Sequence, residues 1–258
     1  MAERPFSPSF SPCAVIPVFD HERTIAQVVA AVRESGLPCL LVDDGSGAAC
    51  ARELERLARE VPGTKLIRLA SNRGKGAAVI TGFRAAEAEG RSHALQIDAD
   101  GQHALKDIPR FIEEARAHPA AVICGRPVFD ASMPRLRRYG RWLTHALVWL
   151  ETLSFEIPDS LCGFRVYPLE PVIRLAAEER IGSRMDFDVE VLVRLHWRGV
   201  TLRWIATRVT YPLDGISHFR LVRDNAHMVS LQLRLLAGML LRLPRLIARK
   251  RLSGRKLA

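Results

Sequence analysis

Residues 13–46 have the sequence CAVIPVFDHERTIAQVVAAVRESGLPCLLVDDGS, and this stretch decides the fold. Its short apolar runs at residues 13–19 and 38–43 are typical of buried strands. Between them, residues 24–34 place apolar side chains every three or four positions, as amphipathic helices do, and Gly36 stands where helices often end. The stretch therefore predicts a strand, a helix and a second, parallel strand.

The same alternation continues along the first half of the chain. Residues 65–69 and 94–98 are further short apolar runs, and residues 48–60 and 76–89 are further amphipathic stretches. This order predicts an α/β, Rossmann-like fold with a mostly parallel central sheet and helices on both faces. In such sheets ligands bind beyond the carboxyl ends of the strands, so polar residues at strand ends are the candidates for function.

The second half is less regular but contains the same two kinds of pattern. Strands are predicted at residues 121–125, 162–168 and 200–211, and helices at residues 138–155 and 187–197. The helix at 138–155 is rich in Trp and Leu, which suits either a buried core helix or a helix that a lipid acceptor approaches.

Most of the positive charge lies near the C-terminus. The formal net charge is +10, and eight Lys and Arg residues, but no acidic residue, follow Asp224. Because this charge accompanies leucines rather than stacking aromatic side chains, we expect no nucleic acid partner. We expect a catalytic domain at residues 1–221 and an amphipathic basic helix and tail at residues 222–258.

Residues 230–249 predict the amphipathic part of this tail. At about 100° per residue, Arg234, Arg242, Arg245 and Arg249 form one stripe opposite Leu, Met and Ile. The uncharged runs are much shorter than the ~20 apolar residues of a membrane-spanning helix. An interfacial helix on a membrane surface is favoured, and a helix packed on the catalytic domain is the alternative.

The N-terminal residues and the cysteines indicate the compartment. The start MAERPFSPSFSP has no apolar segment of the kind found in secretory signals. The five cysteines form no CxxC pair and no His/Cys cluster with zinc spacing, so we expect them to be reduced and mostly buried. We therefore expect a cytoplasmic protein, peripheral at the cytoplasmic face of the membrane.

Two acidic residues end the second predicted strand. Asp43 and Asp44 are followed by Gly45 and Ser46. Carboxylates at a strand end can accept hydrogen bonds from a base or a ribose. The alternative is that Asp44 or Ser46 caps the next helix.

A basic, glycine-containing turn follows the third predicted strand. It comprises Asn72, Arg73, Gly74, Lys75 and Gly76 and opens a helix. Glycines let a ligand approach the backbone, and a helix N-terminus with two cations favours an anion. The spacing is not that of a P-loop, and a simple turn is the alternative.

The strongest local signal follows the fourth predicted strand. Asp98, Ala99, Asp100, Gly101 and Gln102 come directly after the apolar run. Two carboxylates at i and i+2 on a bending strand end can converge on Mg²⁺ or Mn²⁺, which prefer oxygen ligands and often share them with substrate phosphates. An ordinary acidic turn is the alternative.

A divalent cation at this position suits chemistry in which a diphosphate leaves, because it stabilises the charge on the departing oxygens. Arg126 and Arg165 are candidates for phosphate contacts, and ordinary surface arginines are the alternative. His218 and Arg220 lie in a glycine-containing stretch that is expected near the donor or acceptor.

Taken together, six segments resemble family 2 glycosyltransferases of the GT-A fold, and especially the dolichol-phosphate and polyprenyl-phosphate sugar synthases. The segments are VIPVFDHERTI, LLVDDGS, NRGKGAAVITG, IDADGQH, DSLCGFRVY and MDFDVEVL. The resemblance implies an inverting enzyme that moves a sugar from a UDP- or GDP-linked donor to a lipid or lipid-phosphate acceptor at the membrane surface. Relatives often carry C-terminal transmembrane helices, and this sequence does not, which leaves the acceptor open.

The resemblance also implies roles for particular residues. Residues near the donor are expected to be Pro17, Phe19 through Glu22, Asp43, Asp44, Asn72, Lys75, Asp98, Ala99, Asp100, Arg126 and Arg165. Among them, Asp43 and Asp44 would contact the base and ribose. Asp98, Asp100 and Gln102 would hold the metal, Mg²⁺ or Mn²⁺, with the diphosphate.

Inversion needs a general base, unless the acceptor's own phosphate oxygen attacks. Asp159, Asp188 and Glu190 are the candidates, and Asp186 is a candidate cap of the helix that follows it. The QxxRW motif of processive polysaccharide synthases is absent, which argues against a polymerase. A sugar-phosphate nucleotidyltransferase is the alternative function, although a GGxGxRL-type glycine loop is absent.

Overall fold

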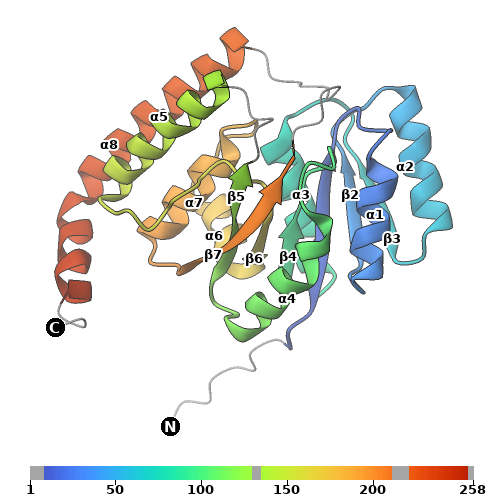
Figure 1. The fold of residues 1–258 in the computed structure, drawn as a ribbon, viewed down its shortest axis with the longest axis horizontal. Helices are drawn as coiled ribbons and strands as arrows, with labels where there is room; N and C mark the ends of the chain where they lie inside the picture. The colour runs from blue at the N-terminus through green and yellow to red at the C-terminus, as the bar shows by residue number, and fades with distance from the viewer. Residues whose placement is uncertain (1–8, 130–134, 211–220, 255–258) are drawn as a thin grey trace.

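The computed structural model describes residues 9–129, 135–210 and 221–254, and its centre is one seven-stranded sheet (Figure 1). The strand order is β3-β2-β1-β4-β6-β5-β7. The strands are β1 (Pro12–Val18), β2 (Cys39–Asp43), β3 (Thr64–Arg68), β4 (His93–Gln96), β5 (Val122–Phe129), β6 (Arg165–Pro168) and β7 (Leu202–Val209).

Helices cover both faces of this sheet, as the sequence predicts. They are α1 (Ile25–Glu34), α2 (Ala48–Glu60), α3 (Lys75–Ala88), α4 (Ile108–Ala117), α5 (Arg135–Thr152), α6 (Leu169–Glu178), α7 (Phe187–Trp197) and α8 (Leu221–Gly254), with a short 3₁₀ turn, η1 (Leu105–Asp107), before α4. One apolar cluster joins the sheet to α1, α2 and α4, and a second joins it to α3, α6 and α7. The predicted α/β fold is therefore confirmed.

The direction of β6 shapes the edge of the sheet where ligands are expected. β6 is antiparallel to both β4 and β5, whereas the other neighbouring pairs are parallel. The start of β6 consequently lies at the same edge as the carboxyl ends of β1, β2 and β4. Residues just before Arg165 therefore reach the edge where Asp43 and Asp98 are found.

Several element boundaries differ from those expected. β4 ends at Gln96, so Asp98 lies in the turn after the strand rather than in it. Helices α4 and α6 were not among the predicted elements, although Pro109 at the start of α4 is a typical helix-initiating residue. α8 extends well beyond the predicted 230–249 at both ends.

α8 packs beside α5 at one end of the molecule, where Figure 1 shows the two helices side by side. Leu231 and Leu235 of α8 are fully buried and belong to the same apolar cluster as α3 and α7. No helix within the described residues is long and apolar enough to cross a membrane.

Candidate active site

The turns after β1 and β2 are tied to each other. Asp43, fully buried at the end of β2, accepts the backbone amide of Ser46 at 2.8 Å, and its other oxygen lies 3.2 Å from Nε of Arg68. Ser46 Oγ accepts the amide of Asp20, and Asp20 Oδ1 accepts the amide of Gly47. These bonds place the segment from Phe19 onward next to the acidic end of β2.

Asp44 holds the turn that begins α3. Its two carboxylate oxygens accept the backbone amides of Arg73 and Gly74 at 2.7 and 2.8 Å. Burial raises the pKa of Asp44, and these two hydrogen bonds oppose the change. The N-cap of the next helix, α2, is Gly47, so the alternative that Asp44 or Ser46 caps this helix is wrong. Asp44 instead shapes the basic turn before Lys75.

Lys75 brings two carboxylates together. Its Nζ lies 2.6 Å from Oδ1 of Asp98 and 2.8 Å from Oδ2 of Asp188. Burial would lower the pKa of Lys75, but the two carboxylates raise it well above its usual range. Burial would raise the pKa of Asp98, but Lys75 and then His103 hold it well below its usual range. Lys75 and Asp98 are therefore charged at neutral pH.

Gly163 closes over this charged cluster. A Cβ atom at Gly163 would lie 2.6 Å from Oδ2 of Asp98 and 2.7 Å from Nζ of Lys75. A side chain at this position would have to displace one of the two. The segment before β6 thus forms one wall of the site, and only glycine leaves the ion pair undisturbed.

The acidic turn after β4 is packed against the turn after β1. The buried Ala99 accepts a 2.6 Å hydrogen bond at its carbonyl oxygen from Oγ1 of Thr24. Asp100 is half-buried and accepts the amide of Gln102 at 3.0 Å, while Gly101 adopts a φ of 70°. The turn therefore has a defined conformation at the sheet edge.

The turn after β4 carries the three side chains that the sequence predicts as metal ligands. Within the described part of the chain, no group of three or more His, Cys, Asp and Glu side chains can hold a metal. The side chains of Asp98, Asp100 and Gln102 carry oxygen atoms, and those of Asp98 lie 2.6 Å from Nζ of Lys75 and 3.5 Å from Nε2 of His103. Mg²⁺ typically takes one or two carboxylates and fills its other positions with phosphate oxygens and water.

Asp159 is an unsuitable general base. Its Oδ1 accepts the amides of Leu161 and Cys162, each at 2.9 Å, and its Oδ2 pairs with Arg141 and lies 3.3 Å from Nε2 of His145. Burial would raise the pKa of Asp159, but His145 and Arg141 lower it to about 2. A carboxylate this acidic and this fully bonded takes up a proton poorly.

Glu190 connects α7 to α8 and to the segment before α7, and does not face the cluster around Lys75. It is fully buried, and it accepts the amide of Gly182 at 2.7 Å and Nε of Arg194 at 2.9 Å. Arg234 of α8 lies 3.3 Å from the same carboxylate. Of the three predicted bases, only Asp188 is brought next to Asp98, through Lys75.

The two predicted phosphate-binding arginines occupy different environments. Arg165 is fully buried and donates to the Tyr167 hydroxyl and to the carbonyl oxygens of Ser160 and Asp188 at 2.7–2.8 Å. This geometry does not fit the expected phosphate contact, and Arg165 instead supports the segment that carries Asp188. Arg126 is exposed on β5.

The remaining predicted residues are distributed around the same edge. Pro17 is buried within β1, while Phe19 and Glu22 are half-buried in the turn after it. Asn72 is exposed, and its side-chain oxygen lies 3.4 Å from Arg184. His218 and Arg220 lie outside the described residues.

Sequence reasoning missed the partners of Asp159. Arg141 and His145 are four residues apart on one face of the predicted helix, and this spacing lets both side chains contact the same group. That spacing was a usable signal, but the sequence does not show that the partner lies in the loop at residue 159.

Comparisons with known proteins agree with this architecture. The family model described as "Glycosyl transferase family 2" matches residues 13–172. The chain is 27% identical over 186 residues to a dolichyl-phosphate beta-glucosyltransferase of Dictyostelium discoideum, which covers 68% of this chain but only 55% of that protein. It is 27% identical over 174 residues to the undecaprenyl-phosphate mannosyltransferase of Micrococcus luteus, covering 66% of this chain and 70% of that protein.

A solved structure shares the fold. Glucosyl-3-phosphoglycerate synthase from Mycobacterium tuberculosis, solved with Mn²⁺, UDP-glucose and phosphoglyceric acid, superposes with a TM-score of 0.60. The identity is 14%, and the match covers 90% of this chain and 79% of that one. At this identity the likeness shows the fold alone.

Proposed function

Because this chain belongs to glycosyl transferase family 2, we propose that it transfers a sugar from a UDP- or GDP-linked donor to a polyprenyl phosphate or another lipid acceptor. The observation that carries the proposal is the charged cluster of Lys75, Asp98 and Asp188 at the carboxyl edge of the sheet. The acceptor class rests on the relatives named for dolichyl phosphate and undecaprenyl phosphate.

The donor nucleotide is assigned to the carboxyl ends of β1 and β2. Pro17, Phe19 and Glu22 border this position, and Asp43 is the buried carboxylate that ends β2. Asp44 contributes by holding the backbone of the turn before Lys75, through the two amide hydrogen bonds described above. Asn72 lies exposed in that same turn.

The donor diphosphate is assigned to the acidic turn after β4. Asp98, Asp100 and Gln102 would hold Mg²⁺ or Mn²⁺, and the cation would neutralise charge on the departing nucleoside diphosphate. The Lys75 ammonium is the protein's own cation at this place, held by Asp98 and Asp188. It fixes the orientation of the Asp98 carboxylate before any ligand binds.

A phosphate acceptor removes the need for a strong general base. Its anionic oxygen can attack the sugar directly, which agrees with the low pKa of Asp159 and the buried, fully bonded Glu190. We assign Asp188 to positioning, since it shares Lys75 with Asp98. Arg126, exposed on β5, is assigned to the acceptor phosphate.

We further propose that the chain works on the cytoplasmic face of a membrane, with residues 1–221 forming the catalytic domain and residues 222–258 the membrane-facing part. The support is the amphipathic pattern of α8. It exposes Leu233 and Leu240 while burying Leu231 and Leu235 against the rest of the molecule.

The test is a transfer assay with purified protein, Mn²⁺, a panel of UDP- and GDP-sugars and detergent-solubilised polyprenyl phosphate. We expect release of a nucleoside diphosphate and a glycosylated lipid, and a loss of at least about a hundredfold in Asp100→Ala. Glu60→Ala, which removes an exposed carboxylate on α2, is the matched control and should remain active. Release of pyrophosphate from a nucleoside triphosphate would instead identify a nucleotidyltransferase.

A further inference from the structure

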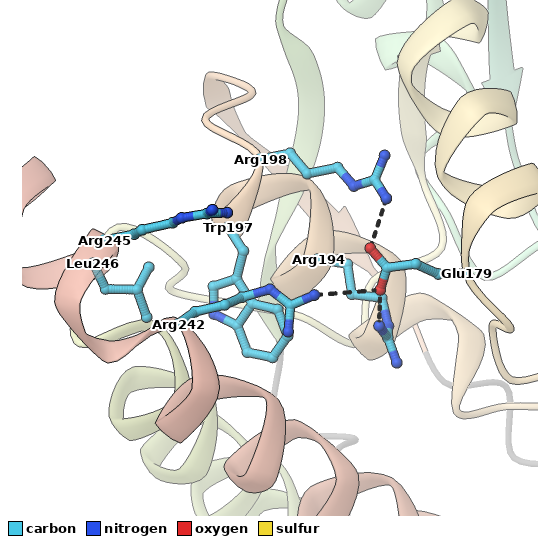
Figure 2. Close-up of a pocket in the computed structure, with 7 residues that line it drawn as sticks. All are labelled: Glu179, Arg194, Trp197, Arg198, Arg242, Arg245 and Leu246. Carbon is cyan, nitrogen blue, oxygen red and sulfur yellow. Dashed lines mark hydrogen bonds and ion pairs between the residues drawn. The ribbon is translucent and has the colours of Figure 1, made fainter.

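Two arginines of α8 attach this helix to the rest of the molecule. Arg242 pairs with Glu179, the residue after α6, as Figure 2 shows, and Arg234 pairs with Glu190 of α7. Arg194 joins the two carboxylates, because it pairs with both Glu179 and Glu190. α8 therefore contacts one network of ion pairs at two places along its length.

Arg234 is shared by two buried carboxylates. Its Nη2 lies 3.3 Å from Oε2 of Glu190 and 3.7 Å from Oδ2 of Asp186. These carboxylates are four residues apart at the start of α7, a spacing at which like charges repel each other. Because both side chains are buried, salt screens this repulsion only weakly. The Arg234 cation offsets the repulsion and keeps the two carboxylates in place.

These two carboxylates hold the segment just before α7, residues 182–184. Glu190 accepts the backbone amide of Gly182 at 2.7 Å, and Asp186 accepts the backbone amide of Arg184 at 3.0 Å. A Cβ atom at Gly182 would overlap with Oδ2 of Asp186, so the backbone passes directly against this carboxylate. The position of the segment therefore depends on where the two carboxylates are held.

The same segment packs against the start of α3, where Lys75 lies. The carbonyl oxygen of Ser183 accepts the backbone amide of Ala77 at 3.0 Å. A Cβ atom at Gly76 would lie 2.6 Å from the carbonyl oxygen of Gly182, so the two backbones touch with no room for a side chain between them. A shift of the segment would therefore shift the turn that carries Lys75.

The first turn of α7 provides a second link to the charged cluster. Asp188 lies in this turn, between Asp186 and Glu190, and its Oδ2 lies 2.8 Å from Nζ of Lys75. Arg234 thus contacts the residues two positions before and two positions after Asp188. Both partners of the ion pair between Lys75 and Asp188 are therefore connected to α8 through contacts with Arg234.

We propose that Arg234 is a positioning residue for sugar transfer, which acts through Glu190 and Asp186 on the segment and the helix turn that hold Lys75 and Asp188. The geometry of the charged cluster then depends on how α8 is seated on the sheet and its helices. The effect on transfer rests on the function proposed above, whereas the effect on the backbone around Lys75 is measurable without it.

The first test compares variants of Arg234 in sugar transfer to detergent-solubilised polyprenyl phosphate. Arg234→Gln should lower kcat about tenfold and change the KM of the acceptor by less than about twofold, because it displaces the charged cluster and removes no acceptor contact. Arg234→Lys keeps the cation and should restore kcat to within about threefold of the wild type. The control Arg245→Gln removes an exposed cation of α8 that has no ion-pair partner among the described residues, and it should stay within about twofold.

The second test measures hydrogen exchange and needs no substrate. The Ala77 amide is bonded to Ser183, and Arg234→Gln should speed its exchange at least about fivefold, while Arg245→Gln should not. The Ala51 amide of α2, which is also bonded to a backbone carbonyl oxygen, is the reference and should exchange at the wild-type rate in both variants. Urea unfolding checks that each variant is folded under the conditions of both tests.

Three results would overturn the inference. A raised acceptor KM with unchanged kcat in Arg234→Gln would mean that Arg234 binds the acceptor itself. A kcat for Arg234→Lys as low as that for Arg234→Gln would show that the cation is not what matters. Equal acceleration of exchange at Ala77 and Ala51 would reduce Arg234 to a contributor to overall stability. If the wild type transfers no sugar, the proposed function fails, and exchange at Ala77 alone decides whether α8 holds the turn.

Discussion

Gly163 is the residue whose substitution tests the charged cluster most sharply. A methyl group there would lie within 2.7 Å of both Lys75 and Asp98. We expect Gly163→Ala to displace one partner and to reduce sugar transfer by roughly tenfold to a hundredfold, with a loss of about 1–3 kcal/mol in the free energy of unfolding. Transfer kinetics and urea unfolding measure the two effects.

Gly140 provides the matched control for this change. It lies in α5, and a Cβ atom there would meet nothing within 4 Å. Gly140→Ala should leave transfer unchanged and stabilise the helix by up to about 1 kcal/mol. Equal activity of the two alanine variants would contradict the role given to the Lys75–Asp98 pair.

Glu151 makes stability depend on pH. It is fully buried in α5, and neither carboxylate oxygen has a hydrogen-bond partner among the described residues. Burial raises its pKa to about 8. Because the folded state binds the proton more tightly than the unfolded state, the free energy of unfolding should fall as pH rises from about 4.5 to 8.

Glu151→Met removes this buried acid with little change in volume. We expect the variant to exceed the wild type in unfolding free energy by roughly 1–3 kcal/mol at pH 8.5, and by less at pH 5. Urea unfolding at both pH values measures the difference, and the exposed Glu87→Met serves as control. A variant that is less stable than the wild type at both pH values would refute the assignment.

At the scale of elements, α8 is expected to be part of the folded core. Leu235 is fully buried, whereas Leu233 on the same helix is 64% exposed. Leu235→Ala should lower the free energy of unfolding by about 2–4 kcal/mol, and Leu233→Ala by less than about 0.5 kcal/mol. Equal small effects in urea unfolding would show that α8 is not packed as described.

The sequence predicted most elements because their patterns are local. The runs that became β1 to β3 and the repeats that became α1 to α3 need no information beyond a window of about fifteen residues. The antiparallel direction of β6 was not predictable in this way, since an apolar run does not encode the direction in which it pairs. That direction is what brings Gly163 to the active edge.

At the scale of the molecule, the candidate site depends on contacts between distant parts of the chain. Gln96 donates to Asp188 across 92 positions, and Lys75 joins residues from two further segments. The sequence identified Asp98, Asp188 and Lys75 as polar residues at element ends, but not that they meet. The sequence also predicted ligand-binding or catalytic roles for Arg165, Asp159 and Glu190, which the structure shows to be buried and bonded to other protein groups. Their burial was not predictable, because a charged residue that is paired inside the protein looks the same in the sequence as one that faces a ligand.

We propose that the acidic turn after β4 binds a divalent cation together with a nucleoside diphosphate. The most direct measurement is calorimetric titration of UDP and GDP into the protein, with Mn²⁺ or with EDTA. Either UDP or GDP should bind at least about tenfold more tightly in Mn²⁺ than in EDTA. The Asp100→Asn substitution should remove that difference. Equal affinity in Mn²⁺ and EDTA, or an undiminished Mn²⁺ effect in Asp100→Asn, would contradict the assignment of the cation to this turn.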